Sequence, residues 1–273
     1  MIIDFHTHTY PDKIVKHAIQ KLESNSGWKA VSDGTKAGLQ KAMQQSGVDL
    51  SVLLPVATSK RQVDTINDEA ARTNETTDQT GLLSFGGIHP ETPDIKQTIR
   101  TIKNLGLKGI KLHPDYQDAY VNDIRYKRIV DQATEQGLYI VIHAGEDSGL
   151  PDPIHCRPEH IREVLRDTGS DRLILAHMGG WRLWDEVEEL LIGEDVYFDT
   201  ATSLEGIPGV TGLLTKEHFA HLVRKKGADR ILFGTDSPWQ NAADNIQWIE
   251  ETELLEEEKE NIFSKNAKRI LGL

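Results

Sequence analysis

The 273-residue chain has one cysteine, no run of more than three lysines or arginines and no long apolar stretch. The single cysteine, Cys156, excludes a disulfide within the chain and is typical of a reducing compartment, so we expect a cytoplasmic protein. No apolar run approaches the roughly 20 residues that a membrane-spanning helix requires, and we expect no membrane partner. The apolar opening at residues 1–6 carries no basic leader and predicts a first strand rather than a signal peptide.

Acidic residues outnumber basic ones by 43 to 31, which gives a formal net charge of -12. An acidic surface repels phosphate backbones, so we expect no nucleic-acid partner. The hydrophobic fraction of 38% and the charged fraction of 27% are those of an ordinary globular protein with a large core.

Short apolar runs recur along the chain, each followed by a longer amphipathic stretch. Most of the runs do not alternate with polar residues, which is typical of parallel strands buried on both faces. The runs read IIDFH, SVLLPVA, LLSFGGIH, LKGIKLH, LYIVIH, RLILAH, VYFDT and ILFGTD, and they begin near Ile2, Ser51, Leu82, Leu107, Leu138, Arg172, Val196 and Ile231. The predicted helices cover about 59–78, 92–105, 118–136, 157–168, 182–193, 215–226 and 240–251.

This alternation predicts an α/β fold, a closed (β/α)8 TIM barrel that forms a single domain over residues 1–273. An open doubly wound sheet is the alternative. It would require a glycine-rich phosphate turn after an early strand, whereas the first strand ends in the letters HTH. Residues 9–48 exceed one crossover helix and predict an insertion after strand 1, with an extra helix over the barrel mouth. The tail at 252–273 is expected to be helical and to pack outside the barrel.

Side chains that can bind metals stand at the C-terminal ends of several predicted strands. Five of the eleven histidines end an apolar run and an aspartate ends the last one: His8, His89, His113, His143, His177 and Asp236. The C-terminal ends of all strands in a barrel meet at one face, where active sites lie. One such histidine is more often structural, but five with an aspartate predict a functional site at this mouth.

The first strand carries two histidines, His6 and His8, whose side chains are expected on the same side of the strand, toward the barrel axis. Neutral imidazole is a good ligand for zinc and similar ions. An H-x-H pair taken alone is weak evidence, because it occurs often by chance. Asp4 is expected on the same side of the strand as His6 and His8 but deeper in the barrel. We expect it to be a hydrogen-bonding residue of the core.

The segments IIDFHTH, VIHAG, ILAHMGG, RILFGTDSPW and IFSKNAKRILGL together resemble the amidohydrolase superfamily. Within it they are similar to the amidohydrolase-2 group, which includes the aminocarboxymuconate-semialdehyde decarboxylase-like enzymes. The resemblance implies one divalent ion, Zn²⁺ first and Mn²⁺ second, held by His6, His8, His143 and Asp236 with one position open. It also implies that His177 acts as an acid or base, and that the chain forms a homodimer, as family members often do.

Binuclear members of this superfamily add a bridging carboxylated lysine or a glutamate from strand 4, which here reads KGIKLH. Lys111 and His113 share one face of this strand, and His113 is expected nearer the metal. A histidine cannot bridge two ions as a carbamate does, so one ion is favoured. A carboxylated Lys111 that bridges two ions is the alternative.

Further residues near the predicted mouth are candidates for contact with the substrate. His89 and His113 could contact substrate or hydrogen-bond to a neighbouring loop. Arg157 could hold a substrate carboxylate or cap the following helix. Trp181 and Trp239 could line the pocket.

The first functional hypothesis is metal-assisted hydrolysis of an amide, ester or lactone-type bond in a small molecule. Asp236 would take a proton from water, and His177 would stabilise the oxyanion or protonate the leaving group.

The alternative hypothesis is non-oxidative decarboxylation, or hydration, of a small carboxylic acid. Related decarboxylases commonly use an arginine from the strand-1 insertion, and residues 9–48 contain none, which counts against it. A TatD-like deoxyribonuclease is a remote third hypothesis. It would require a glutamate on strand 4 and a charge suited to DNA, and the chain has neither.

Overall fold

The computed structural model describes residues 1–207 and 209–273, and its strands are parallel. The strands are β1 (Ile3–Thr7), β2 (Leu50–Leu53), β3 (Leu82–Ser84), β4 (Gly86–Gly87), β5 (Gly109–Leu112), β6 (Tyr139–Ile142), β7 (Leu173–Leu175), β8 (Tyr197–Asp199) and β9 (Ile231–Leu232). All the predicted strands are present. The run at 82–89 is divided at Phe85 into β3 and β4.

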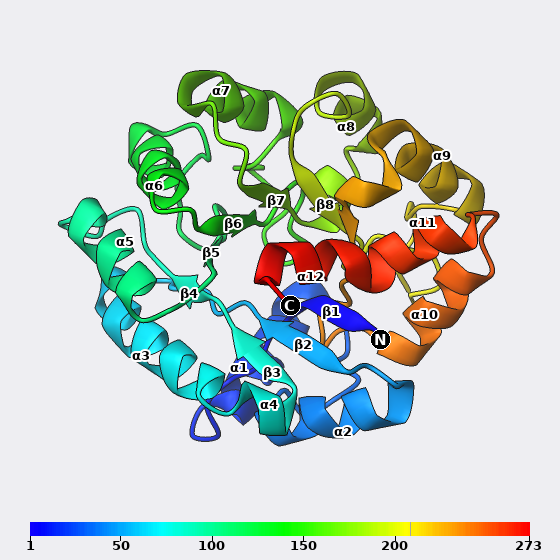
Figure 1. The fold of residues 1–273 in the computed structure, drawn as a ribbon, viewed down its shortest axis with the longest axis horizontal. Helices are drawn as coiled ribbons and strands as arrows, with labels where there is room; N and C mark the ends of the chain where they lie inside the picture. The colour runs from blue at the N-terminus through cyan, green and yellow to red at the C-terminus, as the bar shows by residue number, and fades with distance from the viewer. Residues whose placement is uncertain (208) are drawn as a thin grey trace.

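The strands are ordered β1-β2-β3 in one sheet and β4 to β9 in the other. Hydrogen bonds between the first and last strand segments close the ring. Phe5 N donates to Phe233 O at 2.8 Å, Asp236 N donates to His6 O at 2.8 Å, and His8 N donates to Ser237 O at 2.7 Å. Figure 1 shows the strands encircled by helices, and the predicted barrel is confirmed.

Helices follow the strands in the predicted order: α2 (Lys36–Ser46), α3 (Val63–Asn74), α5 (Ile95–Asn104), α6 (Ile124–Glu135), α7 (Pro158–Thr168), α8 (Trp184–Leu190), α9 (Lys216–Lys226) and α10 (Ala242–Glu250), with a short α4 (Thr77–Thr80). Several begin where a side chain accepts a hydrogen bond from a first-turn amide, as sequence start signals require. These N-cap residues are Thr35, Asp94, Asp123, Thr215 and Asn241. In the described residues, no helix is both long and apolar enough to cross a membrane.

The insertion after β1 contains the extra helix α1 (Val15–Ser26). The segment that follows α1 contacts the C-terminal ends of two strands. Trp28 packs edge-on against Trp181 with ring centroids 5.9 Å apart, and Val31 N donates to Pro238 O at 2.8 Å. The insertion therefore reaches the barrel mouth, as its length predicted.

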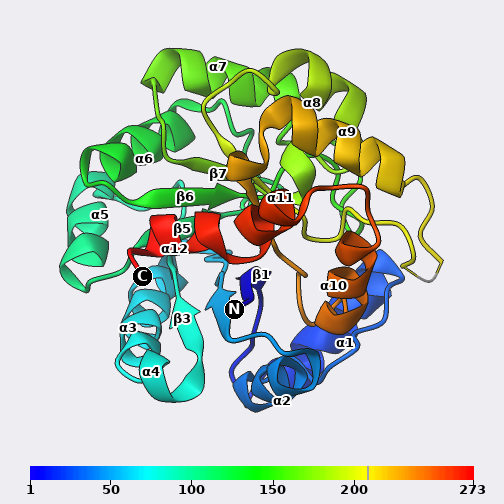
Figure 2. The ribbon, with the colours of Figure 1, turned by 45° about the vertical axis from the view of Figure 1, so that its right-hand side comes forward.

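The C-terminal tail forms α11 (Glu256–Glu260), a π-helical turn (Asn261–Lys265) and α12 (Asn266–Leu271). It lies outside the ring of strands, as predicted, and Figures 1 and 2 show it crossing one end of the ring. Apolar residues of α12, including Ile270 and Leu271, belong to the same buried cluster as Ile3 and Phe5 from β1. The tail thus completes the interior core at the end of the barrel opposite the histidines.

The side chains of strand β1 do not alternate regularly between the two faces of the strand. Its pairing with β2 shifts register between Asp4 and Thr7, so that Phe5 belongs to the interior cluster while the next side chain, His6, reaches interior Lys111. Asp4 is 2% exposed, and it accepts hydrogen bonds from Thr235 N at 3.0 Å and Thr235 Oγ1 at 2.6 Å. Its predicted hydrogen-bonding role in the core is correct, and the contact ties the first strand to the last.

The closure through Asp4 predicts a pH-dependent stability. Burial raises the pKa of Asp4 from 3.8 to about 7, although its hydrogen bonds oppose this shift. Below pH 3.8 the group is protonated in both states. Above it the unfolded chain loses the proton first, so the free energy of unfolding should fall by about 4 kcal/mol as the pH rises toward 7. Asp4→Asn should remove this fall, measured by urea unfolding of metal-free protein at several pH values.

The exposed Asp12→Asn variant is the control for this measurement, since it should retain the fall. If the difference in unfolding free energy between wild type and Asp4→Asn does not change with pH, Asp4 ionises normally in the folded protein.

Candidate metal centre

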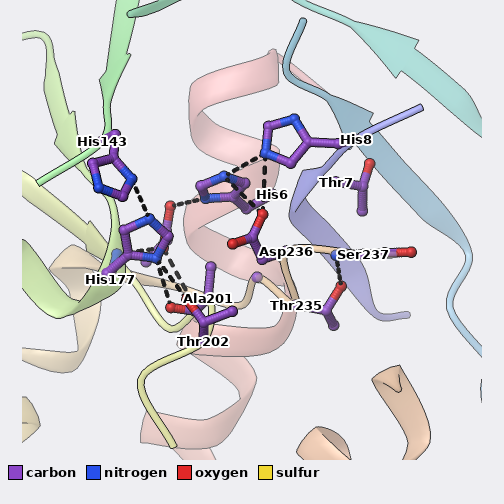
Figure 3. Close-up of polar contacts among 12 residues, drawn as sticks. His6, Thr7, His8, His143, His177, Ala201, Thr202, Thr235, Asp236 and Ser237 are labelled. Atoms are coloured by element: carbon purple, nitrogen blue, oxygen red, sulfur yellow. Dashed lines mark hydrogen bonds and ion pairs between the residues drawn. The ribbon is translucent and has the colours of Figure 1, made fainter. Parts of the chain in front are cut away.

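Two histidines from β1 and its extension meet one aspartate beyond β9. His6 Nε2 lies 3.2 Å from His8 Nε2, and Asp236 Oδ1 lies 3.1 Å from His8 Nε2 and 3.6 Å from His6 Nε2. Figure 3 shows the three side chains facing one another. The structure therefore brings three of the four predicted ligands to one point.

His6 is held in a fixed orientation by a carboxylate behind it. Its Nδ1 lies 2.8 Å from Asp199 Oδ2, at the end of β8, and both side chains are buried. A carboxylate that accepts the Nδ1 proton leaves the Nε2 lone pair free for a metal ion. Burial lowers the pKa of His6 well below its usual value, and Lys111 adds to this, so the imidazole is neutral as a ligand must be.

Glycine is required where the last strand approaches His6. A Cβ atom on Gly234 would lie 2.8 Å from His6 Cβ, which is closer than real side chains allow. Two residues later Asp236 has a left-handed backbone with φ 61°, and His177 has φ 60°. Non-glycine residues in this region are strained, and such residues concentrate at functional sites.

The electrostatic surroundings keep Asp236 ionised. Burial acts to raise its pKa, but His6, His8 and His177 together lower the pKa of Asp236 well below its usual value. The carboxylate is therefore available as a metal ligand at neutral pH.

His177 and His143 form a second pair next to this cluster. His177 Nε2 lies 2.9 Å from His143 Nδ1, and the His6 and His177 rings lie 5.3 Å apart between centroids. His177 Nδ1 lies 2.8 Å from Ala201 O, which fixes the ring. His143 thus lies beside His177 rather than within the group of His6, His8 and Asp236 (Figure 3).

Strand β5 differs from the expectation that His113 would be nearest the metal. Lys111 Nζ lies 3.2 Å from His6 Nε2, whereas His113 is stacked between Tyr116 and His143 at centroid distances of 3.9 and 4.0 Å. Burial lowers the pKa of Lys111 to about 8. The reason for the error is depth: His6 lies level with Lys111, the next-to-last residue of β5, which is two places before His113.

A second group of metal-binding side chains surrounds His113. His113, His143 and Asp147 offer ligand atoms within 4.8 Å of one another. Asp147 follows β6 and Asp115 follows β5, and all four side chains are buried. Asp115 Oδ2 lies 3.9 Å from His143 Nε2.

The other predicted substrate contacts have local partners. His89 Nδ1 accepts a hydrogen bond from Glu91 N at 3.1 Å, which is the loop contact given as its alternative. Arg157 immediately precedes α7 and forms an ion pair with Glu186 of α8, so its side chain has a surface partner.

The two predicted tryptophans differ in their surroundings. Trp181 is buried, donates from Nε1 to Thr202 O at 3.0 Å and contacts Trp28 of the insertion. Trp239 is half-buried, and its backbone N donates to Asp236 O at 3.0 Å. Of the two, Trp181 has a defined contact with the segment that covers the mouth.

Sequence reasoning missed the buried carboxylates. Asp199 is the next-to-last residue of the run VYFDT, close to a predicted strand end as His143 is, and this position was the available signal. Asp147 lies two residues beyond the VIHAG motif, in a loop whose course no pattern predicts. Its path depends on Gly145, where a Cβ atom would meet Trp181 N at 2.1 Å.

The chemistry of the donors in the first cluster fits a divalent ion. Two ligands bound about 2.1 Å from a tetrahedral ion lie roughly 3.4 Å apart. The separations here are 3.1 to 3.6 Å between two imidazole nitrogens and a carboxylate oxygen. Lone pairs that face each other at these distances repel unless a positive charge lies between them.

Solved structures resemble the chain over its whole length. An uncharacterized TIM-barrel protein of Bordetella bronchiseptica has a TM-score of 0.75 at 19% identity, covering 99% of this chain and 98% of that one. The 5-carboxyvanillate decarboxylase of Novosphingobium aromaticivorans, solved with manganese, has a TM-score of 0.73 at 15% identity, with 100% and 97% covered. A 2,6-dihydroxybenzoate decarboxylase from Rhizobium has a TM-score of 0.71 at 16% identity, with 99% and 98% covered.

At these low identities the structural similarity shows the barrel fold alone, and a comparison with curated proteins finds no match. The family follows from the sequence itself. A sequence profile described as amidohydrolase matches residues 3–273, which include every residue of the metal cluster. The chain therefore belongs to the amidohydrolase family of metal-dependent enzymes, as its strand-end motifs predicted.

Proposed function

We propose that this protein is a metal-dependent decarboxylase that releases CO2 from a small carboxylic acid without oxidising it. The observation that carries the proposal is the meeting of three ion ligands with a separate buried histidine, His177, at one barrel mouth. Several solved barrels that resemble the chain along its length are named as decarboxylases of hydroxylated aromatic acids. This support ranks decarboxylation above the hydrolysis that the sequence favoured.

The ligand residues would hold one divalent ion through His6 Nε2, His8 Nε2 and Asp236 Oδ1, and the resemblance adds His143. Bound there, the ion supplies a positive charge that orients the substrate carboxylate or an adjacent hydroxyl and stabilises charge that develops on it. Mn²⁺ gains support from the manganese in the Novosphingobium enzyme, and Zn²⁺ fits the nitrogen-rich donor set.

The reaction breaks the bond between the ring or chain carbon and the carboxyl carbon. The electron pair stays on the former carbon, CO2 leaves, and a proton must reach that carbon. His177 is placed to deliver it, since its ring is buried, is fixed by Ala201 O and lies beside the ion cluster. Replacing that proton from water would complete the cycle.

Aromatic side chains favour a flat, partly apolar substrate. Trp181 with Trp28 of the insertion, and Tyr116 stacked on His113, lie at the same end of the barrel. Such faces suit hydroxybenzoates or vinylogous acids, whose carboxylate the ion would bind.

Hydrolysis stays the second candidate, because Asp236 and His177 also occupy the positions that a base and an acid require for water attack. The acidic net charge and the family give no support to a deoxyribonuclease.

The decisive assay offers the Mn²⁺- or Zn²⁺-loaded protein hydroxybenzoates, vinylogous acids, amides and lactones, with CO2 release and hydrolysis measured in parallel. We expect CO2 release, and we expect Asp236→Asn to lower kcat/KM at least about 100-fold because the amide is a poor ion ligand. The exposed Asp244→Asn on α10 is the matched control and should keep full activity. Hydrolysis without CO2 would refute the decarboxylase assignment.

A second prediction tests the support of His6. The side-chain oxygen of Asn at position 199 can still accept from His177 N, as Asp199 Oδ1 now does at 2.9 Å. The amide nitrogen would then face His6 Nδ1, and it cannot accept the proton of that atom. Asp199→Asn should therefore weaken metal binding about 10- to 100-fold, measured by competition with a chelator. Asp195→Asn, an exposed carboxylate just before β8, should leave the affinity unchanged. Equal affinities for Asp199→Asn and wild type would show that this contact does not orient the ligand.

A further inference from the structure

Two buried carboxylates beside His113, those of Asp147 and Asp115, have no part in the proposed reaction. We propose that His113, His143 and Asp147, flanked by Asp115, form a second divalent-cation site for an ion such as Zn²⁺. The proposal is independent of which reaction the first centre performs.

The distances from Asp147 to the two imidazoles suit ion ligands better than hydrogen bonds. Asp147 Oδ2 lies 3.5 Å from His113 Nε2 and 4.0 Å from His143 Nε2. His143 Nε2 also lies 3.2 Å from Glu146 O, a contact that a bound ion would replace. A hydrogen bond between a nitrogen and an oxygen normally spans 2.7 to 3.2 Å, whereas two ligands of one tetrahedral ion lie roughly 3.4 Å apart. A small movement of these side chains toward a shared ion would bring the atoms to ligand spacing.

Asp115 supplies an independent observation. Its Oδ2 atom is buried and has no hydrogen-bond partner among the described residues, and it faces His143 Nε2 at 3.9 Å. The other oxygen, Oδ1, lies 3.0 Å from His155 Nδ1 and also accepts from His155 N. A buried carboxylate oxygen without a partner costs free energy of a few kcal/mol, and a cation beside His143 would remove that cost.

The charge balance points the same way. Asp115 and Asp147 are 5 and 7% exposed, and no lysine or arginine among the described residues lies within 4 Å of either carboxylate. Buried carboxylates in proteins are paired with cations or coordinate metals. The imidazoles that face them here are nitrogen ligands of the kind that borderline divalent ions prefer.

The ligand residues are held in place by their own neighbours. Asp147 Oδ1 accepts from Gly149 N at 2.8 Å, and Asp147 pairs with Leu150 across a short antiparallel bridge. His113 is stacked on Tyr116 with an interplanar angle of 3°. The site is thus largely formed before an ion arrives, which reduces the entropic cost of binding.

The proposed site is distinct from the two-ion arrangement of the superfamily, in which a carboxylated lysine bridges the ions. That arrangement would use Lys111, whose Nζ lies beside His6. The proposed site instead uses the outward ring nitrogen of His143, Nε2, while Nδ1 of the same ring lies next to His177. His143 therefore links the two centres.

The test is the number of ions bound per chain. Metal-free full-length protein is dialysed to equilibrium against Zn²⁺ alone, and bound zinc is measured by mass spectrometry, with calorimetric titration for the affinities. We expect two ions for wild type and one for Asp147→Asn. Asp236→Asn should also bind one, and the double variant none. Asp152→Asn, an exposed carboxylate in the same loop, is the matched control and should bind two.

Lys111→Ala separates the two explanations of a second ion. It should still bind two ions if the site is the proposed one. One ion in wild type, two in Asp147→Asn, or loss of the second ion in Lys111→Ala but not in Asp147→Asn would each overturn the proposal. Circular dichroism and thermal unfolding check that each variant folds, and His113→Gln replaces Asp147→Asn if that variant does not. Because zinc is counted without substrate, failure of the decarboxylase assay leaves this result unaffected.

Discussion

The pairing of the first strand with the last is the contact on which the site depends. Phe5, His6 and His8 are hydrogen-bonded to residues 233–237, and Asp4 accepts two hydrogen bonds from Thr235. The backbone bond from Asp236 N to His6 O places two ion ligands on adjacent chain segments that are 230 residues apart. Barrel closure and assembly of the metal centre are therefore one event, and a loss of register between β1 and β9 would separate the ligands.

This closure carries an electrostatic cost, because polar groups replace apolar ones at the top of the core. His6, Asp199 and Lys111 are almost fully buried and contact one another. Burial opposes the charged form of each, as the raised pKa of Asp199 and the lowered pKa of Lys111 indicate. A cation bound at His6 would offset the cost of burying the nearby carboxylates, so binding of the ion and stability of the fold are coupled. The apolar interior that α12 completes lies at the opposite end, where no such cost arises.

The sequence was sufficient for the strands, the helices and the grouping of three candidate ligands, because apolar periodicity and strand-end position are local properties. It was insufficient for depth and orientation. The register shift in β1 moves His6 to the level of Lys111, and no pattern in IIDFH marks that shift. The direction of each ring nitrogen of His143 depends on the His177 ring and on the backbone oxygen of Glu146, a loop residue. Arg157 shows the same limit, since its partner Glu186 lies on another helix.

The charges at the mouth connect ion binding to the choice of substrate. Asp236, Asp147 and Asp115 all lie at the C-terminal ends of the strands or just beyond them, and the net charge of the chain is -12. A carboxylate substrate approaching this face meets like charge, which opposes its binding in a low-dielectric pocket. Cations at the mouth would reverse that sign, so under the proposed function an ion would assist binding of an acid before it assists any bond cleavage. Neutral amides or lactones would not need an ion in order to bind. The effect of the metal on substrate affinity would therefore differ between acids and neutral substrates.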